Sequence, residues 1–326
     1  MLSINNHRIL IIGWPMRPPQ AWLSEYPSVT AERIYQEDLP RREKHLKDLS
    51  FHMPKALQFS DAVTPSTWYG KWKADIASYD TVILIDEVRG KDVFEYILEH
   101  NPSCNLCAFY DSPVRNGSPK EPSRYRDMPV RFFTCDRKIA AKYQITFAPY
   151  FYVFSPCSFH SFPAPAKEYQ QDVFFIGEEK GDRRAQLEHL SAVLDEAHLS
   201  HLFHLVPQNR HRSLLYRHRP AGGGYMPYSE VQEHIRSSRA ILELISDGQT
   251  GITQRPFEAM FLQKKLITSS AEVSRYDFYR PENVFILGER PLSELPEFLK
   301  TPFSPIPEEI LQEYTLEGWL QHFLVD

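Results

Sequence analysis

The sequence predicts an α/β protein in which two halves, each with a parallel sheet, follow one another along the chain. Short, continuous apolar runs recur throughout, and such runs are typical of strands buried on both faces of a parallel sheet. Amphipathic segments with helical periodicity separate these runs. Residues 155–171 contain three prolines and no periodicity, and the strand–helix alternation restarts after them, so this stretch is the expected linker.

The first half begins with Arg8-Ile-Leu-Ile-Ile-Gly13, which predicts a first buried strand. Further strands are expected at 81–86, 105–110 and 131–134. A helix is expected at 91–99, because apolar residues at 93, 94, 97 and 98 share one face. A second amphipathic helix, ending near Tyr143, follows the strand at 131–134.

The second half repeats this alternation. A helix is expected at 182–196, two short amphipathic helices at 308–314 and 316–324, and strands at 172–177, 201–206, 240–245, 265–268 and 283–287. The two halves predict Rossmann-like domains at 1–160 and 161–326 that face each other across a cleft. The last helix, with Trp319 and Phe323, either packs back on the first domain or stays on its own domain.

Composition limits the class of protein. A chain of 326 residues is long for one core, so about two domains are expected. A hydrophobic content of 42% and a charged content of 24% are those of a globular protein. The net charge of −5 provides no general basic field, so nucleic acid is not an expected partner. Two local basic clusters, Arg41-Arg42 with Lys44 and residues 204–219, are typical of solvated faces or loops.

Neither a metal site nor a membrane span is expected. Cys104 and Cys107 form a C-x2-C pair, but no second pair completes a zinc set, and no Asp-x-Asp occurs. The N-terminus lacks the apolar region of a signal peptide, and no apolar run approaches 18 residues. The sequence therefore predicts a cytoplasmic protein with reduced thiols, with peripheral contact at the inner face of the cell membrane as a further possibility.

The most informative stretch is 246–260, Ser-Asp-Gly-Gln-Thr-Gly-Ile-Thr-Gln-Arg-Pro-Phe-Glu-Ala-Met. It joins two predicted strands through a glycine-containing loop and a helix, which is the arrangement of a nucleotide site at the carboxyl end of a parallel sheet. Gly248 and Gly251 allow close approach of a ligand, Arg255 can reach a diphosphate, and Glu258 can accept from a ribose. The alternative is an ordinary strand–loop–helix unit with a surface Arg–Glu pair at i, i+3.

Three segments in order carry a family resemblance: Thr134–Tyr143 with Pro149-Tyr-Phe-Tyr152, Asp172–Gly177 running to Arg184, and Tyr228–Ser270. They resemble GT-B glycosyltransferases, and more narrowly the bacterial cell-surface polysaccharide transferases related to spore-maturation glycosyltransferase-like proteins. Many retaining GT-B enzymes carry a glutamate eight positions before the one that Glu258 matches, but this chain has Thr250 there. The resemblance therefore leaves the stereochemical outcome open.

The resemblance implies a hexosyltransferase that moves a sugar from a nucleotide-sugar donor to a growing surface glycan, such as lipopolysaccharide or capsule. The missing Asp-x-Asp and the basic residues near Gly177 predict that it works without a metal. The nucleotide sugar is a substrate, and no cofactor is expected. Two alternatives remain open: a GT-B-like nucleotide-sugar epimerase and a non-catalytic GT-B-derived binding subunit.

On the donor side, Gly177 ends a predicted strand, and Asp182 is expected to cap the helix that follows. Lys180, Arg183 or Arg184 can neutralise the departing diphosphate, a role that metals play in other transferases. The alternative for this segment is a charged surface turn.

Tyr228 follows a triple-glycine loop at 220–225 and lies either near the nucleotide base or in a plain connection, in which Ser229 caps the next helix. On the acceptor side, Asp86 and Asp111 end predicted strands, and a transferase needs a base or a charge to assist the reaction. Asp111 is the first choice for the catalytic carboxylate and Asp86 the second, although either can be an ordinary strand-end acid.

Overall fold

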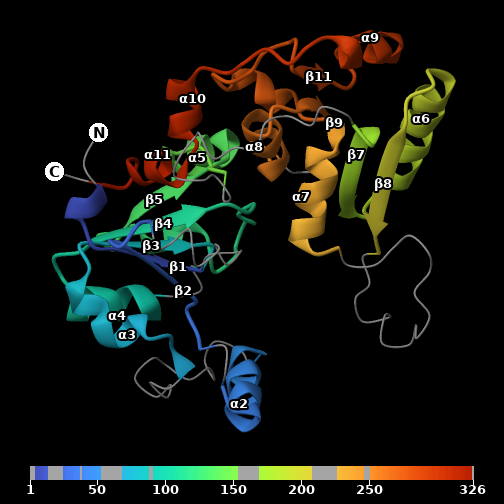
Figure 1. Ribbon diagram of the computed structural model, residues 1–326. Coiled ribbons are helices and arrows are strands. Elements are labelled where there is room, and N and C mark those ends of the chain that lie inside the picture. Colours follow the sequence, from blue (N-terminus) through green and yellow to red (C-terminus); the bar gives the residue numbers. More distant parts are fainter. Residues whose placement is uncertain are drawn as a thin grey trace. The chain divides into compact units, whose positions relative to one another are not determined.

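The computed structural model describes residues 4–13, 25–36, 39–52, 68–87, 91–152, 169–207, 226–245 and 250–324 (Figure 1). The chain divides into two compact units. The first unit comprises Met1–Cys157 together with Leu316–Asp326, and the second comprises Ser158–Thr315. Each unit contains one parallel sheet, of six strands in the first and five in the second. The predicted α/β fold with two successive parallel sheets is therefore confirmed.

The sheet of the first unit has the strand order β2-β1-β3-β4-β5-β6. Its strands are β1 (Ile9–Ile12), β2 (Val29–Glu32), β3 (Thr81–Ile85), β4 (Asn105–Tyr110), β5 (Arg131–Thr134) and β6 (Thr146–Phe147). The four strands predicted in this half are confirmed as β1, β3, β4 and β5. The edge strands β2 and β6 escaped prediction because β2 buries only Val29 and β6 is two residues long.

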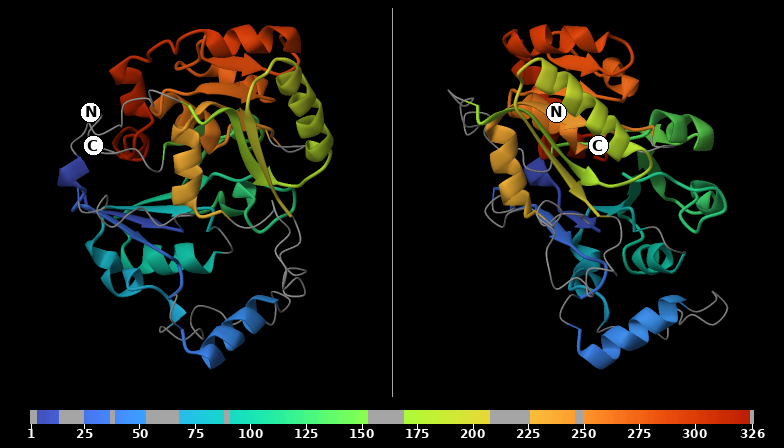
Figure 2. Two further views of the ribbon diagram at one scale, coloured as in Figure 1. Left: turned by 45° about the vertical axis from the view of Figure 1, so that its right-hand side comes forward. Right: turned by 90° about the vertical axis from the view of Figure 1, so that its right-hand side faces the viewer.

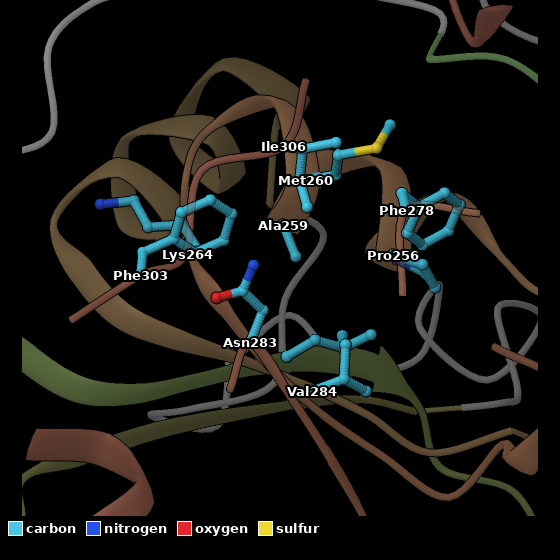
Figure 3. A pocket seen from close by; sticks show the side chains of 10 residues that line it. Pro256, Ala259, Met260, Lys264, Phe278, Asn283, Val284, Phe303 and Ile306 are labelled. Atoms are coloured by element: carbon cyan, nitrogen blue, oxygen red, sulfur yellow. The ribbon is translucent and has the colours of Figure 1, made fainter. Parts of the chain in front are cut away.

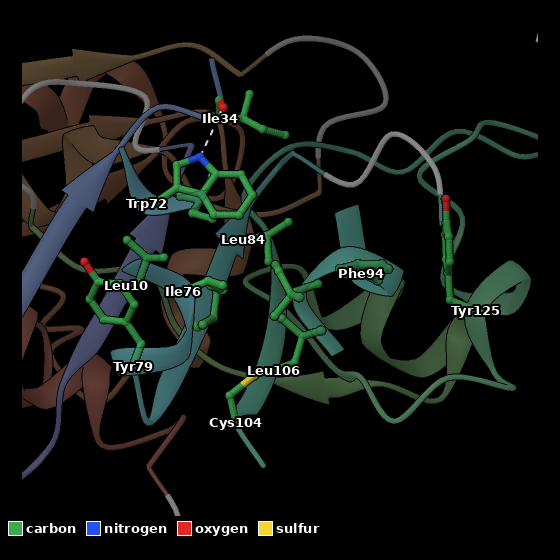
Figure 4. Close-up of a cluster of buried hydrophobic side chains, with 14 of the residues drawn as sticks. Leu10, Ile34, Trp72, Ile76, Tyr79, Leu84, Phe94, Cys104, Leu106 and Tyr125 are labelled. Carbon is green, nitrogen blue, oxygen red and sulfur yellow. Dashed lines mark hydrogen bonds between the residues drawn. The ribbon is translucent and has the colours of Figure 1, made fainter. Parts of the chain in front are cut away.

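Helices α3 (Trp72–Asp75) and α4 (Asp92–His100) cover one face of this sheet, and a hydrophobic core lies beneath them (Figure 1). The other helices of this part of the chain are α2 (Arg41–His52) and α5 (Arg137–Tyr143). Leu10, Leu84, Trp72 and Phe94 pack together in this core, and the Trp72 indole Nε1 donates to the Ile34 carbonyl at 3.1 Å (Figure 4). The two helices predicted in this half are confirmed as α4 and α5.

The last described residues complete the opposite side of the first unit. Helix α11 (Leu316–Leu320) places the Trp319 ring 5.2 Å from that of Phe109 and 4.7 Å from that of Phe151. The Phe323 carbonyl accepts from Asn105 Nδ2 at 2.6 Å. Trp319 and Phe323 are both fully buried, so these residues belong to the core of the first unit.

The sheet of the second unit has the order β11-β10-β9-β7-β8, and helix α6 packs beside β8 (Figure 2). Its strands are β7 (Gln171–Glu178), β8 (His201–Val206), β9 (Ser238–Glu243), β10 (Lys265–Thr268) and β11 (Val284–Ile286). Its helices are α6 (Arg183–Glu196), α7 (Tyr228–Arg236), α8 (Gln254–Phe261), α9 (Leu295–Lys300) and α10 (Glu308–Glu313). Every strand predicted in this half is confirmed. Most of the predicted linker, residues 153–168, lies outside the described residues.

No helix in the described part of the chain is both long enough and apolar enough to cross a membrane.

Candidate functional site

Polar side chains gather in the second unit where β9 ends and α8 begins. We call this group the Glu258 cluster, and it consists of Tyr228, Glu243, Thr253, Arg255 and Glu258. Carboxyl ends of parallel strands and helix N-termini are where α/β folds bind ligands. The sequence pattern at 246–260 predicted such a site, and the structure brings Arg255, Glu258 and Tyr228 together there.

Helix α8 begins at a side-chain cap. Thr253 Oγ1 accepts from the backbone N–H of Arg255 at 3.1 Å and donates to Glu243 Oε1 at 2.5 Å. The first bond satisfies an amide that has no partner within the helix. The second ties the start of α8 to the last residue of β9, so the cap fixes the helix start against the strand end.

Glu258 is the most deeply buried acid of the cluster, with no exposed surface. Its Oε1 accepts from the Tyr228 hydroxyl at 2.5 Å, and its Oε2 forms an ion pair with Arg255 Nη1. Burial alone lowers the pKa of Arg255, but the charge of Glu258 and its hydrogen bond raise the pKa above the ordinary value. Arg255 and Glu258 therefore form a buried charged pair, unlike the surface pair that was the alternative.

Glu243 is a second buried carboxylate that the sequence analysis missed. Its Oε2 accepts from Thr268 Oγ1 at 2.5 Å, while Oε1 accepts from Thr253. Burial raises the pKa of Glu243, and the two threonine hydrogen bonds and the charge of Arg255 lower it. An acid inside the otherwise apolar run 240–245 was the available signal, since a charge in a buried strand needs partners.

The loop ahead of α8 is described only in part. Gly251 is half-buried and precedes the capping Thr253, whereas Gly248 lies outside the described residues, as does 246–249 as a whole. The glycine loop at 220–225 and residues 208–219 of the basic segment also lie outside them. Helix α7 begins at Tyr228 with Pro227 at the cap position and no side-chain cap bond. The predicted Ser229 cap is wrong, because the cap position lies two residues earlier, at Pro227, and Ser229 is already inside the helix.

Arg183 links the ends of two neighbouring strands. Its Nη1 donates to the Glu178 carbonyl at 2.5 Å and its Nη2 to the Leu244 carbonyl at 2.6 Å. Burial lowers the pKa of Arg183. The same Nη1 would be 3.3 Å from a Cβ added at Gly177, and the Phe175 ring would be 2.9 Å from it. Glycine at the end of β7 therefore leaves room for the Arg183 bridge.

Lys180 and Arg184 lie on the surface beside this bridge. Lys180 Nζ is 2.6 Å from Glu178, and Arg184 Nε is 2.6 Å from Glu179. Both pairs are exposed, so each is weak and both cations can reach other anions. Asp182 occupies the cap position of α6 without a cap bond, because its carboxylate accepts from Gln186 Nε2 at 2.8 Å instead. The predicted side-chain cap by Asp182 is therefore wrong.

A second carboxylate pair lies in the first unit, at the ends of the adjacent strands β3 and β4. Asp86 directly follows β3 with φ of 55°, in the left-handed region that a short polar side chain tolerates. Its Oδ2 is 3.5 Å from Lys120 Nζ. Its Oδ1 is buried and accepts no hydrogen bond from the described residues. Asp111 follows β4 and accepts from its neighbour Ser112 Oγ at 3.0 Å.

Asp111 binds its proton more tightly than an ordinary aspartate does. Burial, followed by the hydrogen bond and charge of Asp86, raises the pKa of Asp111 to about 7, although Ser112 and Lys120 oppose this shift. Two further groups face the pair: Cys135 Sγ donates to the Asp111 carbonyl at 3.7 Å, and Tyr150 is buried near both acids. A carboxyl that keeps its proton near neutral pH can donate it to a neighbouring carboxylate. The structure thus brings together the two acids that the sequence analysis selected.

A hollow lies on another face of α8, lined mainly by apolar residues of α8, β10 and the segment 278–306 (Figure 3). Its two polar side chains already have partners. Lys264 Nζ donates to the Arg236 carbonyl at 2.6 Å, and Asn283 exchanges two hydrogen bonds of 2.7 Å with the Ser304 backbone. The rest of the lining is apolar, and we assign no ligand to this hollow.

The described residues contain no group of three or more His, Cys, Asp or Glu side chains arranged to hold a metal ion. Cys104 and Cys107, the C-x2-C pair, are buried free thiols, and burial raises their pKa values to about 11 and about 12. A protonated buried thiol is an inert packing group.

Comparisons with known proteins give structural likeness at low identity. No family model and no curated protein matches the sequence. The apo form of the lipopolysaccharide outer-core galactosyltransferase WaaB has 16% identity and a TM-score of 0.46, with 97% of each chain covered. A protein of Listeria monocytogenes assigned as a UDP-N-acetylglucosamine 2-epimerase has 9% identity and a TM-score of 0.41, covering 96% of this chain and 93% of that one.

The glycosyltransferase SnogD from Streptomyces nogalater has 11% identity and a TM-score of 0.38, covering 97% of this chain and 96% of that one. At these identities the function of the chain has to be argued from its own residues.

Proposed function

We propose that this chain is a metal-independent glycosyltransferase that moves a sugar from a nucleotide-sugar donor to a growing cell-surface glycan. The Glu258 cluster carries the proposal. A partly exposed guanidinium and a fully buried carboxylate, one helical turn apart at the start of α8, lie beside the end of a parallel strand. Those two groups supply opposite halves of a nucleotide site: a cation for phosphate and an acceptor for ribose hydroxyls.

Arg255 retains donors for a ligand. One of its N–H groups serves Glu258, and among the described residues its side chain makes no other hydrogen bond. Its side chain is 21% exposed, and a guanidinium has five N–H groups in a fork that matches phosphate oxygens. The amides and dipole at the start of α8 favour the same charge. We therefore assign the diphosphate to Arg255 and the ribose to Glu258, with Gly248 and Gly251 in the adjoining loop.

The cations near β7 complete the proposed donor side. Arg183 holds the ends of β7 and β9 together, and Gly177 gives it room, so both act by positioning. Lys180 and Arg184 are exposed and weakly paired, so they can follow the charge of the leaving diphosphate. In this assignment, side chains neutralise the charge of the leaving diphosphate, as a divalent metal does in other transferases.

The acid pair of the first unit is assigned to the acceptor. Asp111, with a pKa of about 7, is matched to removing a proton from a hydroxyl near neutral pH. Asp86, with Lys120, sets the charge around Asp111. The same pair can instead stabilise a positively charged sugar in a retaining reaction, and the proposal covers both outcomes.

A surface glycan is assembled on a membrane lipid or next to one, which calls for a surface that meets lipid. Helix α2 exposes Leu46 (51%) and Leu49 (60%), three positions apart, among the exposed basic residues Arg41, Arg42 and Lys44. Apolar and basic side chains on one helix fit an anionic bilayer surface.

Sedimentation with phosphatidylglycerol vesicles should depend on Leu46 and Leu49. Equal sedimentation of a Leu46→Asp, Leu49→Asp variant would remove the membrane from the proposal.

The test of the function is a panel of UDP-, GDP-, ADP- and CMP-sugars incubated with the protein in EDTA. A transferase releases free nucleotide slowly from one donor by hydrolysis, and EDTA leaves that rate unchanged. An isomerised sugar nucleotide would identify an epimerase. Binding without turnover would identify a non-catalytic subunit, and a rate lost in EDTA and restored by Mg²⁺ would overturn metal independence.

A further inference from the structure

The buried carboxylate of Glu258 has both of its oxygens occupied by protein groups. Tyr228 donates to Oε1 at 2.5 Å, and Arg255 pairs with Oε2. With no exposed surface, Glu258 cannot accept from a ligand until one of these partners moves. The question is which partner leaves.

Arg255 is the costly partner to remove. It lies on the same helix as Glu258, three residues away, and its charge compensates a fully buried carboxylate. Separating a buried ion pair leaves both charges without compensation. Tyr228 is neutral, so its departure removes one hydrogen bond from Glu258 and no charge compensation.

The position of Tyr228 also allows movement. It is the first residue of α7, a helix that has no side-chain cap, and its side chain is half-buried. Helix ends fray more readily than helix centres, and Val231 and Ile235 anchor α7 from its later turns. The tyrosine can therefore leave Glu258 without unpacking the helix.

We propose that the Tyr228 hydroxyl occupies the place on Glu258 Oε1 that a ribose hydroxyl of the donor takes, so that donor binding displaces Tyr228. The phenol and the ribose make the same bond, an O–H donated to a carboxylate oxygen. In the free protein the tyrosine satisfies the acid and closes the ribose site. The inference rests on the proposed function, because it takes Glu258 as the ribose acceptor.

If the donor displaces Tyr228, removing the Tyr228 hydroxyl should increase the affinity for the nucleotide. In Tyr228→Phe the closed state loses its hydrogen bond, so a larger fraction of molecules is ready to bind. The Kd for the preferred nucleoside diphosphate should fall by roughly 10- to 150-fold, the ratio that corresponds to one hydrogen bond to a charged group. The gain should vanish for the matching 2′,3′-dideoxynucleoside diphosphate, which has no hydroxyl for Glu258. A purely structural role would not distinguish these two nucleotides.

Calorimetry with UDP, GDP and ADP gives the measurement, and Tyr314→Phe is the matched control. Tyr314 also donates to a carboxylate in the second unit, Asp277 Oδ1 at 2.6 Å, and its loss should leave every Kd unchanged. An unchanged or raised Kd in Tyr228→Phe, with the wild type binding normally, overturns the displacement and spares the proposed function. No binding by either protein overturns both.

Discussion

Each unit has two acids near the ends of parallel strands, but the hydrogen-bond and ion-pair partners of these acids differ between the units. In the second unit, every carboxylate oxygen of Glu243 and Glu258 has a hydroxyl or guanidinium partner. In the first unit, Asp86 Oδ1 has no partner among the described residues, and Asp111 holds a proton up to a pH of about 7. The charge of Glu258 is compensated by its ion pair with Arg255, whereas the raised pKa of Asp111 lets that acid exchange a proton near neutral pH. The first arrangement suits binding and the second suits proton transfer.

The largest expected effect tests the proton-exchanging pair. Asp111→Asn keeps the size of the side chain but removes its basicity, so the turnover of the preferred sugar nucleotide should fall by roughly 10²- to 10⁴-fold. The Kd for the nucleoside diphosphate should remain that of the wild type, because Asp111 lies in the other unit. Steady-state kinetics and calorimetry measure the two quantities.

Asp127→Asn is the control for this comparison, since Asp127 is an exposed acid of the first unit paired with Lys91 at 2.6 Å. The Asp127→Asn variant should turn over the preferred sugar nucleotide at the wild-type rate. If Asp111→Asn also retains the wild-type rate, the pair is an ordinary set of strand-end acids and the contrast between the units loses its functional meaning.

The next effect tests the fixed charges. Arg255→Lys keeps the positive charge beside Glu258 but loses the planar fork, and Glu258→Gln loses the charge that strengthens hydrogen bonds to ligand hydroxyls. A lost charge-assisted hydrogen bond costs about 1.5–3 kcal/mol, so nucleotide affinity should fall roughly 10- to 150-fold. Calorimetry against the preferred nucleoside diphosphate measures this loss.

A second Arg–Glu pair at i, i+3 offers a matched control. Arg275 lies 3.4 Å from Glu272, but its side chain is 64% exposed. Arg275→Lys should leave affinity unchanged. Wild-type affinity in both Arg255→Lys and Glu258→Gln would show that the donor site has been misplaced.

The smallest expected effect is a pH dependence of folding stability, caused by the proton that Asp111 binds. The pKa of Asp111 rises from 3.8 to about 7 on folding, so between these values the folded chain holds a proton that the unfolded chain has released. Its contribution to stability is therefore full below about pH 3.8 and is lost as the pH rises through about 7. Urea unfolding measures the free energy of unfolding at pH 5 and at pH 8. The decrease from pH 5 to pH 8 should be smaller in Asp111→Asn than in the wild type. Equal losses would place the titrating proton elsewhere.

Sequence patterns predicted the strands of both sheets because buried parallel strands are continuous apolar runs, as in 81–86 and 105–110. They failed for β2, which is an edge strand with a single buried residue. Arg255 and Glu258 were predictable as a pair from their spacing on one helix. The complete burial of Glu258, and the partners Tyr228 and Glu243, depend on chain segments at least ten residues away and required the fold.

Caps were the weakest predictions. Asp182 has the residue type of an N-cap, but its carboxylate bonds to the Gln186 side chain, a competing local hydrogen bond that residue type alone does not resolve. Ser229 lies inside α7, because the cap position is Pro227, two residues earlier.

The return of the last residues to the first unit sets an order of events during synthesis. Trp319 and Phe323 fill the core beside Phe109 and Phe133, and the Phe323 carbonyl holds Asn105 and Arg131 at the starts of β4 and β5. The ribosome delivers these residues only after all of Ser158–Thr315. The second unit is therefore complete in sequence while the first still lacks part of its core. The first unit can therefore complete its core only after the whole of the second unit has been synthesised.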